Sequence, residues 1–565
     1  MSLTRSFLAC FLLIVLIVLA GAGHGQAPGP APVFGGVAPF PPIASDWYAY
    51  RHNGLRTGAQ PYASDLSNPT KVGTLAVKWA FPATGPGVGR FTASPIVVDD
   101  VVLVGSRSGH FFALDAATGA LKWQYPKPGD PPLYPPVPNP FGQWNYGIES
   151  SASYWHHGPA QDGGVIFGAQ DPSLGPHGSA RLFALNAKTG AVIWKSDPIA
   201  VIDGTTNGST TELHERIGFS SPLVLGDKVY IGIANNGDNP IQKGRVVAVD
   251  LATGHTDAGF HFRSVGTAAS PPSTRGGGVW NSPASDGVGV YFTTGNTRED
   301  AAGVQTPEPK PNHGLSMIRV NKNTGHLIWA FQPVPYDLDD DPDWAAGVTI
   351  MHTSCGELIA SVQKDGWAYA VEAGHGPPGV LNVKWQFPAT GFPFNASTIH
   401  GDTDYKRPGA AWNDVLIINT GGENLVHDGV FPGYTKLHAL NACAGNEKQR
   451  VRWIADIPNA LGGYAIGAPT VTGGIVFVGT NQGHLIVLAD PSVVPGTGWR
   501  CSNIDYTTPA TCAAAGYVLV PVPKVLANVP MPDGGDIAGM RNEPALAKGR
   551  VFVATGNGHV YMLAP

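Results

Sequence analysis

The sequence is poor in charge and has few cysteines. Only 13% of its 565 residues are charged, the formal net charge is -6, and its Lys and Arg residues are scattered with no basic run. Nucleic-acid binding needs clustered positive charge, so we expect no nucleic-acid partner. No Cys-x-x-Cys-His motif occurs, which excludes a c-type haem carried by this chain.

What the sequence has in abundance is glycine, proline and tryptophan. It contains 74 Gly, 51 Pro and 14 Trp, and 43% of its residues are hydrophobic. A chain with so much apolar content is not disordered, and its many turn-forming residues are typical of short strands joined by tight turns. This composition favours an all-β fold.

The N-terminus has the order of a secretory signal. Arg5 precedes an apolar stretch from Phe7 to Ala20, and small residues follow, with Ala20-Gly21-Ala22 as a plausible cleavage motif. We predict a signal peptide over residues 1–22, a Pro/Gly-rich linker over 23–45, and a periplasmic or secreted protein. An uncleaved signal acting as a membrane anchor is the alternative.

The cysteines outside the signal are even in number, as in chains whose disulfides persist after export. Cys501 and Cys512 flank a short polar loop and are predicted to pair. Cys355 and Cys443 are left over, and they either form a second disulfide or remain two buried thiols.

One motif recurs along the chain. Its first copy, Ala113–Trp123, has an apolar strand end, an Asp with Thr-Gly that makes a turn, and a second strand closed by Trp. Further copies lie at 184–194, 248–254 and 319–329, with weaker ones at 370–385, 439–453, 486–490 and 561–565, which makes eight.

A strand pair lies upstream of most copies, so each repeat supplies the four strands of a propeller blade. The first Trp-containing strand, 75–79, has no upstream strands, whereas the last copy stops just short of its Trp. We therefore predict an eight-bladed β-propeller over residues 46–565, in which the N-terminal strand completes the last blade and closes the ring. The alternative is an open stack of repeats.

The chain resembles the pyrroloquinoline-quinone (PQQ)-dependent alcohol dehydrogenases and their polyvinyl-alcohol-oxidising relatives. The resemblance runs from Asp46 to Pro565 and includes Asp46-Trp47, Arg51-His-Asn-Gly54 and the tryptophan-docking motif Ala-x-Asp-x-x-Thr-Gly-x-x-x-Trp. The motif marks the fold and not the chemistry, because cofactor-free propellers share it.

Segments 276–286 and 290–296 resemble the cofactor floor of that family. The resemblance implies that Trp280 stacks beneath the quinone and that Asn296 binds Ca²⁺. A planar ligand needs an aromatic platform, and a hard cation takes amide oxygens. The alternative for Trp280 is one more blade tryptophan.

Segment 331–344 resembles the loop that supplies the family's catalytic aspartate. Matching Gln332 and Pro335 places Asp337 on the first conserved acid and Asp340 on the catalytic base, which also ligates the metal. Five carboxylates among residues 337–343 leave this register open. The alternative is a solvated acidic loop or a structural calcium site.

Lys364 resembles the cation that contacts the quinone oxygens, although a solvated turn lysine is the plain alternative. Asp238, or else Asn239, stands where the family places a calcium-binding Glu.

Two further positions depart from the family. Segment 147–153 lacks the adjacent cysteines that cap the quinone, and Thr92 stands where an acid is expected.

The resemblance implies an exported quinoprotein oxidoreductase that transfers hydride from an alcohol to PQQ held with Ca²⁺. Its partners would be a small or polymeric alcohol and a separate electron acceptor such as a cytochrome, with a membrane involved only if the signal is uncleaved. The alternative is a cofactor-free propeller that serves as an extracytoplasmic binding or assembly scaffold.

Overall fold

The computed structural model describes residues 44–565 except 64, 134–146, 157–162, 176–177, 202–214, 235–243, 266–275, 297–312, 335–342, 345, 365, 375–380, 389–407, 421–433, 464, 504–505, 533–539 and 541. The chain divides into two compact units, 1–34 and 35–565, and every described residue belongs to the second.

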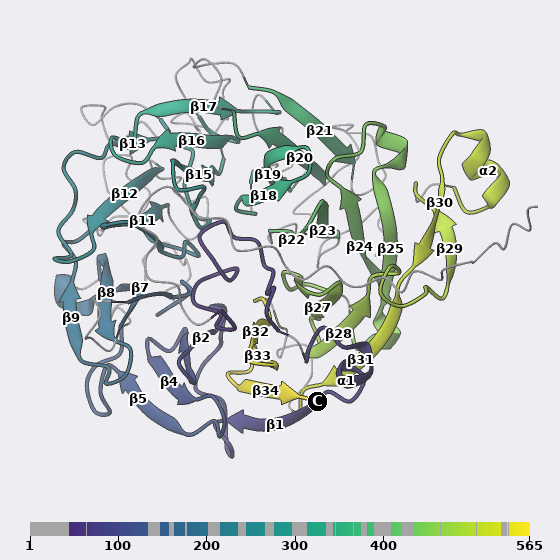
Figure 1. Cartoon of the computed structure of the whole chain (residues 1–565). Coiled ribbons are helices and arrows are strands. Elements are labelled where there is room, and N and C mark those ends of the chain that lie inside the picture. The colour runs from purple at the N-terminus through teal and green to yellow at the C-terminus, as the bar shows by residue number, and fades with distance from the viewer. Residues whose placement is uncertain are drawn as a thin grey trace, which may run out of the picture. The chain divides into compact units, whose positions relative to one another are not determined.

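Eight four-stranded antiparallel sheets form the blades of a ring in the described part of the chain (Figure 1). Blades 1 and 2 contain β2 (Ile96–Val98), β3 (Val101–Gly105), β4 (Phe111–Asp115) and β5 (Leu121–Tyr125), then β6 (Ser153–Trp155), β7 (Gly164–Gln170), β8 (Ala180–Asn186) and β9 (Val192–Lys195). Blades 3 and 4 contain β10 (Leu223–Leu225), β11 (Lys228–Ile233), β12 (Arg245–Asp250) and β13 (Phe262–Arg263), then β14 (Ala284–Ser285), β15 (Gly289–Thr293), β16 (Met317–Asn321) and β17 (Leu327–Phe331).

The second half of the ring repeats this order. Blades 5 and 6 contain β18 (Thr349–Thr353), β19 (Gly356–Val362), β20 (Trp367–Glu372) and β21 (Val383–Pro388), then β22 (Ala410–Trp412), β23 (Val415–Thr420), β24 (Tyr434–Asn441) and β25 (Val451–Pro458). Blades 7 and 8 contain β26 (Thr470–Thr472), β27 (Ile475–Gly479), β28 (His484–Ala489) and β31 (Lys524–Pro530), then β32 (Ala545–Ala547), β33 (Arg550–Ala554), β34 (Val560–Ala564) and β1 (Ala76–Phe81).

An insertion between β28 and β31 forms a hairpin of β29 (Gly498–Cys501) and β30 (Leu519–Val522) with α2 (Pro509–Ala514), outside the ring (Figure 1). The remaining short helices are α1 (Pro69–Val72), η1 (Pro172–Leu174), η2 (Glu447–Gln449) and η3 (Asn459–Leu461). None of the helices within the described ranges has the length and apolarity needed to span a membrane.

The ring closes as the repeats predict. β1 pairs antiparallel with β34, with Ala76 opposite Ala564 and Phe81 opposite Val560. The N-terminal strand thus supplies the outer strand of blade 8, and the predicted eight-bladed propeller is confirmed.

Tryptophans of the repeat motif join neighbouring blades. In blade 1 the Asp115 carboxylate accepts hydrogen bonds from the backbone N–H groups of Ala117 and Thr118, which fixes the turn. The indole of Trp79, from blade 8, donates to the carbonyl of Ala116 in that turn at 3.2 Å. Equivalent indole bonds join Trp123, Trp194 and Trp385 to the carbonyls of Ala187, Leu251 and Ala442, and the Trp453 indole donates to the Asp490 carboxylate instead.

A central arm, residues 46–60, lies along the axis of the ring, where the purple N-terminal segment runs in Figure 1. It hydrogen-bonds to the first strand of every blade, or to the residues directly before that strand. Backbone bonds join Trp47 to Val97, Tyr48 to Tyr154, Gly54 to Ser285, Leu55 to Ile350, Thr57 to Ala411, and both Gly58 and Gln60 to Val471. Side-chain bonds from Arg56 to Pro222 and from Gln60 to Leu546 reach blades 3 and 8.

Two arginines of the central arm are fully buried. Arg51 donates to the carbonyls of Pro469 and Gly409 at 2.8 and 2.7 Å and lies 3.3 Å from the Glu543 carboxylate. Arg56 donates to the Pro283 carbonyl at 2.8 Å. These guanidiniums satisfy carbonyls around the axis that would otherwise be buried without a partner.

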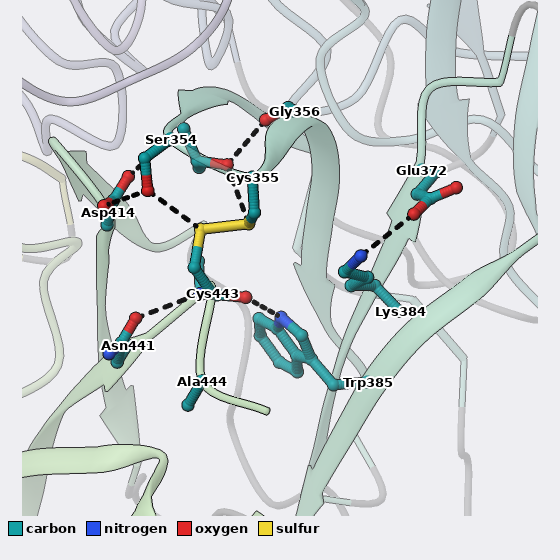
Figure 2. Close-up of a disulfide and its surroundings, with 12 residues drawn as sticks. Ser354, Cys355, Gly356, Glu372, Lys384, Trp385, Asp414, Asn441, Cys443 and Ala444 are labelled. Carbon is teal, nitrogen blue, oxygen red and sulfur yellow. Dashed lines mark hydrogen bonds and ion pairs between the residues drawn. A yellow bond between two sulfur atoms is a disulfide. The ribbon is translucent and has the colours of Figure 1, made fainter. Parts of the chain in front are cut away.

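A disulfide joins blades 5 and 6. Cys355, in the turn between β18 and β19, bonds to Cys443, in the turn after β24 (Figure 2). Beside it Ser354 donates to the Asp414 carboxylate from its backbone N–H at 2.7 Å and its hydroxyl at 2.6 Å. Of the two alternatives for these cysteines, the structure has the disulfide, and the predicted Cys501–Cys512 bond is confirmed.

The turn glycine of the repeat provides a test of tryptophan docking. Gly190 has a φ of +71°, and a Cβ there would lie 2.7 Å from the Trp123 ring. Gly226 has a φ of +64° with open space around it. In Gly190→Ala, left-handed backbone strain should lower the free energy of unfolding by about 1–2 kcal/mol, and overpacking against Trp123 should lower it by a further 1–3 kcal/mol. In Gly226→Ala only the backbone strain should lower it. Equal shifts of the thermal unfolding midpoint in both variants would contradict this account.

The two disulfides form a second matched pair. The Cys355–Cys443 bond closes a loop of 88 residues and the Cys501–Cys512 bond a loop of 11. From the loop-closure entropy of the unfolded chain, these bonds should stabilise the fold by about 4.6 and 2.8 kcal/mol, respectively. Replacing Cys355 and Cys443 with Ala should lower the denaturant midpoint more than replacing Cys501 and Cys512. The opposite order would show that loop length does not govern their contribution.

Candidate cofactor and active site

The candidate site lies on one face of the ring, at the junction of blades 4 and 5. Trp280 precedes β14 and Asn296 follows β15, while Asp343 precedes β18 and Lys364 follows β19. Because neighbouring strands of a blade are antiparallel, the start of the first strand and the end of the second emerge on the same face. The topology therefore brings these four residues to one side.

A carboxylate, an ammonium and an indole meet there. Lys364 Nζ lies 2.7 Å from Asp343 Oδ1, and Trp280 Nε1 donates to Asp343 Oδ2 at 3.1 Å. Lys364 Nζ also lies 5.5 Å from the centre of the Trp280 ring, a cation–π distance. The side chains of Lys364 and Asp343 are only 7% and 4% exposed, so water screens this pair little.

Asn296 stands beside this cluster with an unsatisfied oxygen. Its side chain is buried, and its Oδ1 has no hydrogen-bond partner among the described residues. At Gly295 an added Cβ would lie 3.2 Å from Trp280 Nε1 and 3.3 Å from Asp343 Oδ2. This close approach places the backbone that carries Asn296 directly against the Trp280–Asp343 contact. A buried carbonyl oxygen without a donor is suited to a cation or a bound ligand.

Trp344 fixes the position of Asp343. It is fully buried, and its indole donates to the Leu315 carbonyl at 2.8 Å. Its own carbonyl accepts from Asn281 Nδ2 at 3.1 Å. Because Asn281 directly follows Trp280, its hydrogen bond to the Trp344 carbonyl links the segment that carries Trp280 to the segment that carries Asp343.

Comparison with known proteins matches residues 47–395 to the PQQ family, described as the β-propeller domain of glucose/ethanol/alcohol dehydrogenases. The chain belongs to this family. Its site therefore lies in a fold of the quinoprotein dehydrogenase type, as the resemblance implied.

Curated relatives are distant. The dehydrogenase subunit of the alcohol dehydrogenase (quinone) of Gluconobacter oxydans is 27% identical over 365 residues, which cover 58% of this chain and 43% of that protein. A quinoprotein alcohol dehydrogenase of Pseudomonas putida is 24% identical over 497 residues, which cover 80% and 74% of the two chains. This chain spans about half the length of the first curated relatives that it matches.

Solved quinoprotein structures share the fold. The quinohemoprotein alcohol dehydrogenase of Comamonas testosteroni matches 92% of this chain and 80% of its own, with a TM-score of 0.61 and 17% identity. A europium-containing methanol dehydrogenase matches 93% and 98%, with a TM-score of 0.59 and 16% identity. At these identities the likeness supports the propeller alone.

Of the predicted site residues, Trp280 and Lys364 lie together, and the backbone next to Asn296 approaches Trp280. Trp280 is bonded to the carboxylate of the site, whereas the docking tryptophans bond to turns of the next blade. Asp337, Asp340 and Asp238 lie outside the described residues, so their predicted roles stay predictions.

The structure adds two residues that sequence reasoning did not select. Asp343 was one of five acids in the open register, and the signal for it was the tryptophan that follows it. Gln363 is fully buried, yet neither its Oε1 nor its Nε2 meets a partner within the described part of the chain. It precedes Lys364 and supplies an amide next to the cluster.

Blades 1 to 3 place arginines on the same face of the propeller. Arg107, after β3, pairs with Glu149 before β6 at 2.7 Å. Arg216, before β10, bonds to the Gln170 amide oxygen at 2.7 and 3.0 Å once that amide is oriented to accept. Burial lowers the pKa of Arg216 to about 10, and the charge of Glu149 opposes this shift. Arg216 remains charged at neutral pH.

The buried Asp343–Lys364 pair should show strong coupling. Asp343→Asn alone removes a counter-charge from the buried Lys364 ammonium and should lower the free energy of unfolding by about 3–5 kcal/mol, whereas the double variant Asp343→Asn, Lys364→Met should lower it by less than the sum of the single variants. Denaturant unfolding of the four proteins measures the coupling. Additive losses would mean that the two charges do not interact.

Proposed function

We propose that this protein is an oxidoreductase that oxidises an alcohol with PQQ held together with Ca²⁺. The observation that carries the proposal is the buried Asp343 carboxylate, held between the Lys364 ammonium and the Trp280 indole. Membership of the quinoprotein dehydrogenase family supports the same reaction class.

The residues present fit such a cofactor. Trp280 offers an aromatic face for a planar ligand, with Phe219 edge-on to it at 6.1 Å between ring centres. The unpartnered Oδ1 of Asn296 and the Asp343 carboxylate are oxygen donors of the kind that Ca²⁺ takes. Within the described ranges, no cluster of three His, Cys, Asp or Glu residues could hold a metal. Further ligands would come from the acidic segment that contains Asp337 and Asp340.

When bound, PQQ would supply the hydride acceptor. In this proposal Asp343 accepts the hydroxyl proton of the substrate, the role that the sequence predicted for Asp340. The ammonium of Lys364, 2.7 Å away, favours the charged carboxylate that this role needs. Trp280 Nε1 holds Oδ2 of Asp343 in place, and Lys364 would stabilise negative charge that develops on a nearby carbonyl oxygen.

We further propose that the protein works in the periplasm or outside the cell. The signal-like N-terminus and the two disulfides support an oxidising compartment. The substrate would be a small or polymeric alcohol, and a separate acceptor such as a cytochrome would take the electrons.

The test is reconstitution. Purified protein mixed with micromolar PQQ and Ca²⁺ should show the absorbance of bound quinone, and ethanol or a longer alcohol should change it. Asp343→Asn, checked for folding by circular dichroism, should still bind PQQ but react about 10²–10⁴ times more slowly. Asn296→Ala should need more Ca²⁺ for the same PQQ binding.

Asp227→Asn is the matched control, because it removes an exposed carboxylate in the turn between β10 and β11 on the opposite face. It should leave both binding and reduction unchanged. If wild-type protein fails to bind PQQ with Ca²⁺ at micromolar concentration, the enzyme proposal fails and the scaffold alternative gains support.

A further inference from the structure

A cavity lies at the rim of the ring and is separate from the candidate cofactor cluster, although Trp367, which lines it, follows Lys364 closely on the β19–β20 hairpin. It has a volume of about 250 Å³ and is lined by residues of blades 5 and 6 and of the insertion that contains β29, β30 and α2. In Figure 1 this insertion projects beside β25. The volume is just below the range of roughly 300–1,000 Å³ of drug-sized ligand sites, so it suits one or two small rings.

The insertion is fastened to the ring at this cavity. Within the insertion, the Cys501–Cys512 disulfide joins β29 to α2. Lys448 Nζ, from blade 6, donates to the Ala515 carbonyl at 2.7 Å, and Arg500 pairs with Asp456 of β25 at 2.7 Å. The cavity walls are therefore held in place before any ligand arrives.

Three half-buried aromatic side chains line the cavity, Trp367 and Phe387 from blade 5 and Tyr517 from the insertion. His438 is buried beneath them, with its ring edge-on to Phe387 at 5.7 Å between centres. Burial lowers the pKa of His438 to about 3, with help from the charge of Lys436, so the imidazole is neutral at physiological pH. The aromatic faces supply apolar contact area without charge.

The two charged residues of the lining already have partners. Glu447 accepts two hydrogen bonds from the Arg450 guanidinium, at 2.8 and 2.9 Å. Lys448 is engaged by the Ala515 carbonyl and lies 5.1 Å from the centre of the Tyr517 ring. Glu447 is thus paired with a counter-charge, whereas the Lys448 ammonium is held by a neutral carbonyl and an aromatic ring. A cationic ligand would lose its hydration without gaining a counter-charge, and an anionic ligand would have to break the contacts of Lys448 to gain one.

Neutral hydrogen-bonding groups complete the lining. Gln386, from β21, and Asn503, from the insertion, bring side-chain amides, and the buried His438 brings a ring that donates and accepts. Apolar ring faces combined with amide donors and acceptors match a molecule that has C–H faces and several hydroxyl groups.

We propose that this rim cavity binds a neutral, polyhydroxylated ring compound, that is, one or two units of a saccharide. The sugar ring packs on Tyr517 and Trp367, and its hydroxyl groups bond to Gln386 and Asn503. This site is separate from the proposed cofactor site and needs neither PQQ nor Ca²⁺.

The test is a titration of the full chain, without PQQ, with glucose, maltose and cellobiose, followed by calorimetry or by ligand-observed NMR. At least one of these sugars should bind with a dissociation constant of about 1 mM or tighter. The charged analogues glucuronate and glucosamine should bind more weakly. Tyr517→Ala and Gln386→Ala should each weaken the binding about fivefold.

Trp499→Ala is the matched control, because Trp499 lies on the same insertion, is 71% exposed and does not line the cavity. It should leave sugar affinity unchanged. The proposal is overturned if no neutral sugar binds at 10 mM, if the charged analogues bind better, or if Tyr517→Ala and Gln386→Ala bind as wild type does. None of these outcomes depends on PQQ binding, so the two proposals fail independently.

Discussion

The central arm is the interaction on which the ring depends. The first strand of each blade is short, two to five residues, and faces the axis, where the neighbouring inner strands diverge from one another. The arm hydrogen-bonds to each of these strands or to the residue directly before it, and Arg51 and Arg56 bind carbonyls that no strand pairs. Eight separate sheets are thereby tied to one segment, so a shift of any blade would break bonds at the axis.

The candidate site follows from this rigidity. Its residues come from two blades that meet along a single junction, and Asn281 joins the two by donating to the Trp344 carbonyl. A carboxylate shared between Lys364 and Trp280 needs both blades to stay within a few tenths of an ångström of one another. The tip of the β19–β20 hairpin carries Lys364, and the same hairpin leads to Trp367, where the Gln363 N–H donates to the Trp367 carbonyl at 2.9 Å. One short hairpin therefore borders both the candidate site and the rim cavity.

Features with local signals were predictable from the sequence. The turn Asp/Asn-x-x-Thr-Gly identifies blades 1 to 4, and weaker copies of the motif identify the remaining blades. The incomplete first and last repeats predict their pairing. The third repeat lacks its tryptophan, and there the structure uses a backbone bond instead, from the His261 N–H to the Thr324 carbonyl. The sequence of one repeat does not predict which backbone hydrogen bond takes the place of the missing indole bond.

Features set by tertiary contact were not predictable. Counting from Gln332 could not single out Asp343 as an acid that meets Lys364 and Trp280, because its position depends on Trp344, whose burial is visible only in the folded ring. The Arg216–Gln170 contact joins residues of different blades, and the bonds of the central arm span hundreds of residues. The rim cavity likewise depends on an insertion that meets β25 only after folding.

The pairing of β1 with β34 has a consequence for the order of biosynthesis. On the ribosome, β1 emerges before the strands of blades 1 to 7, but its partner β34 emerges after all of them, so Ala76 has no partner until Ala564 has been made. Blades 1 to 7 have all their strands in sequence order and are free to form as they emerge, whereas blade 8 assembles only after translation has passed residue 564. Until then β1 is an unpaired edge, and a nascent chain that stalls late would expose it to other chains.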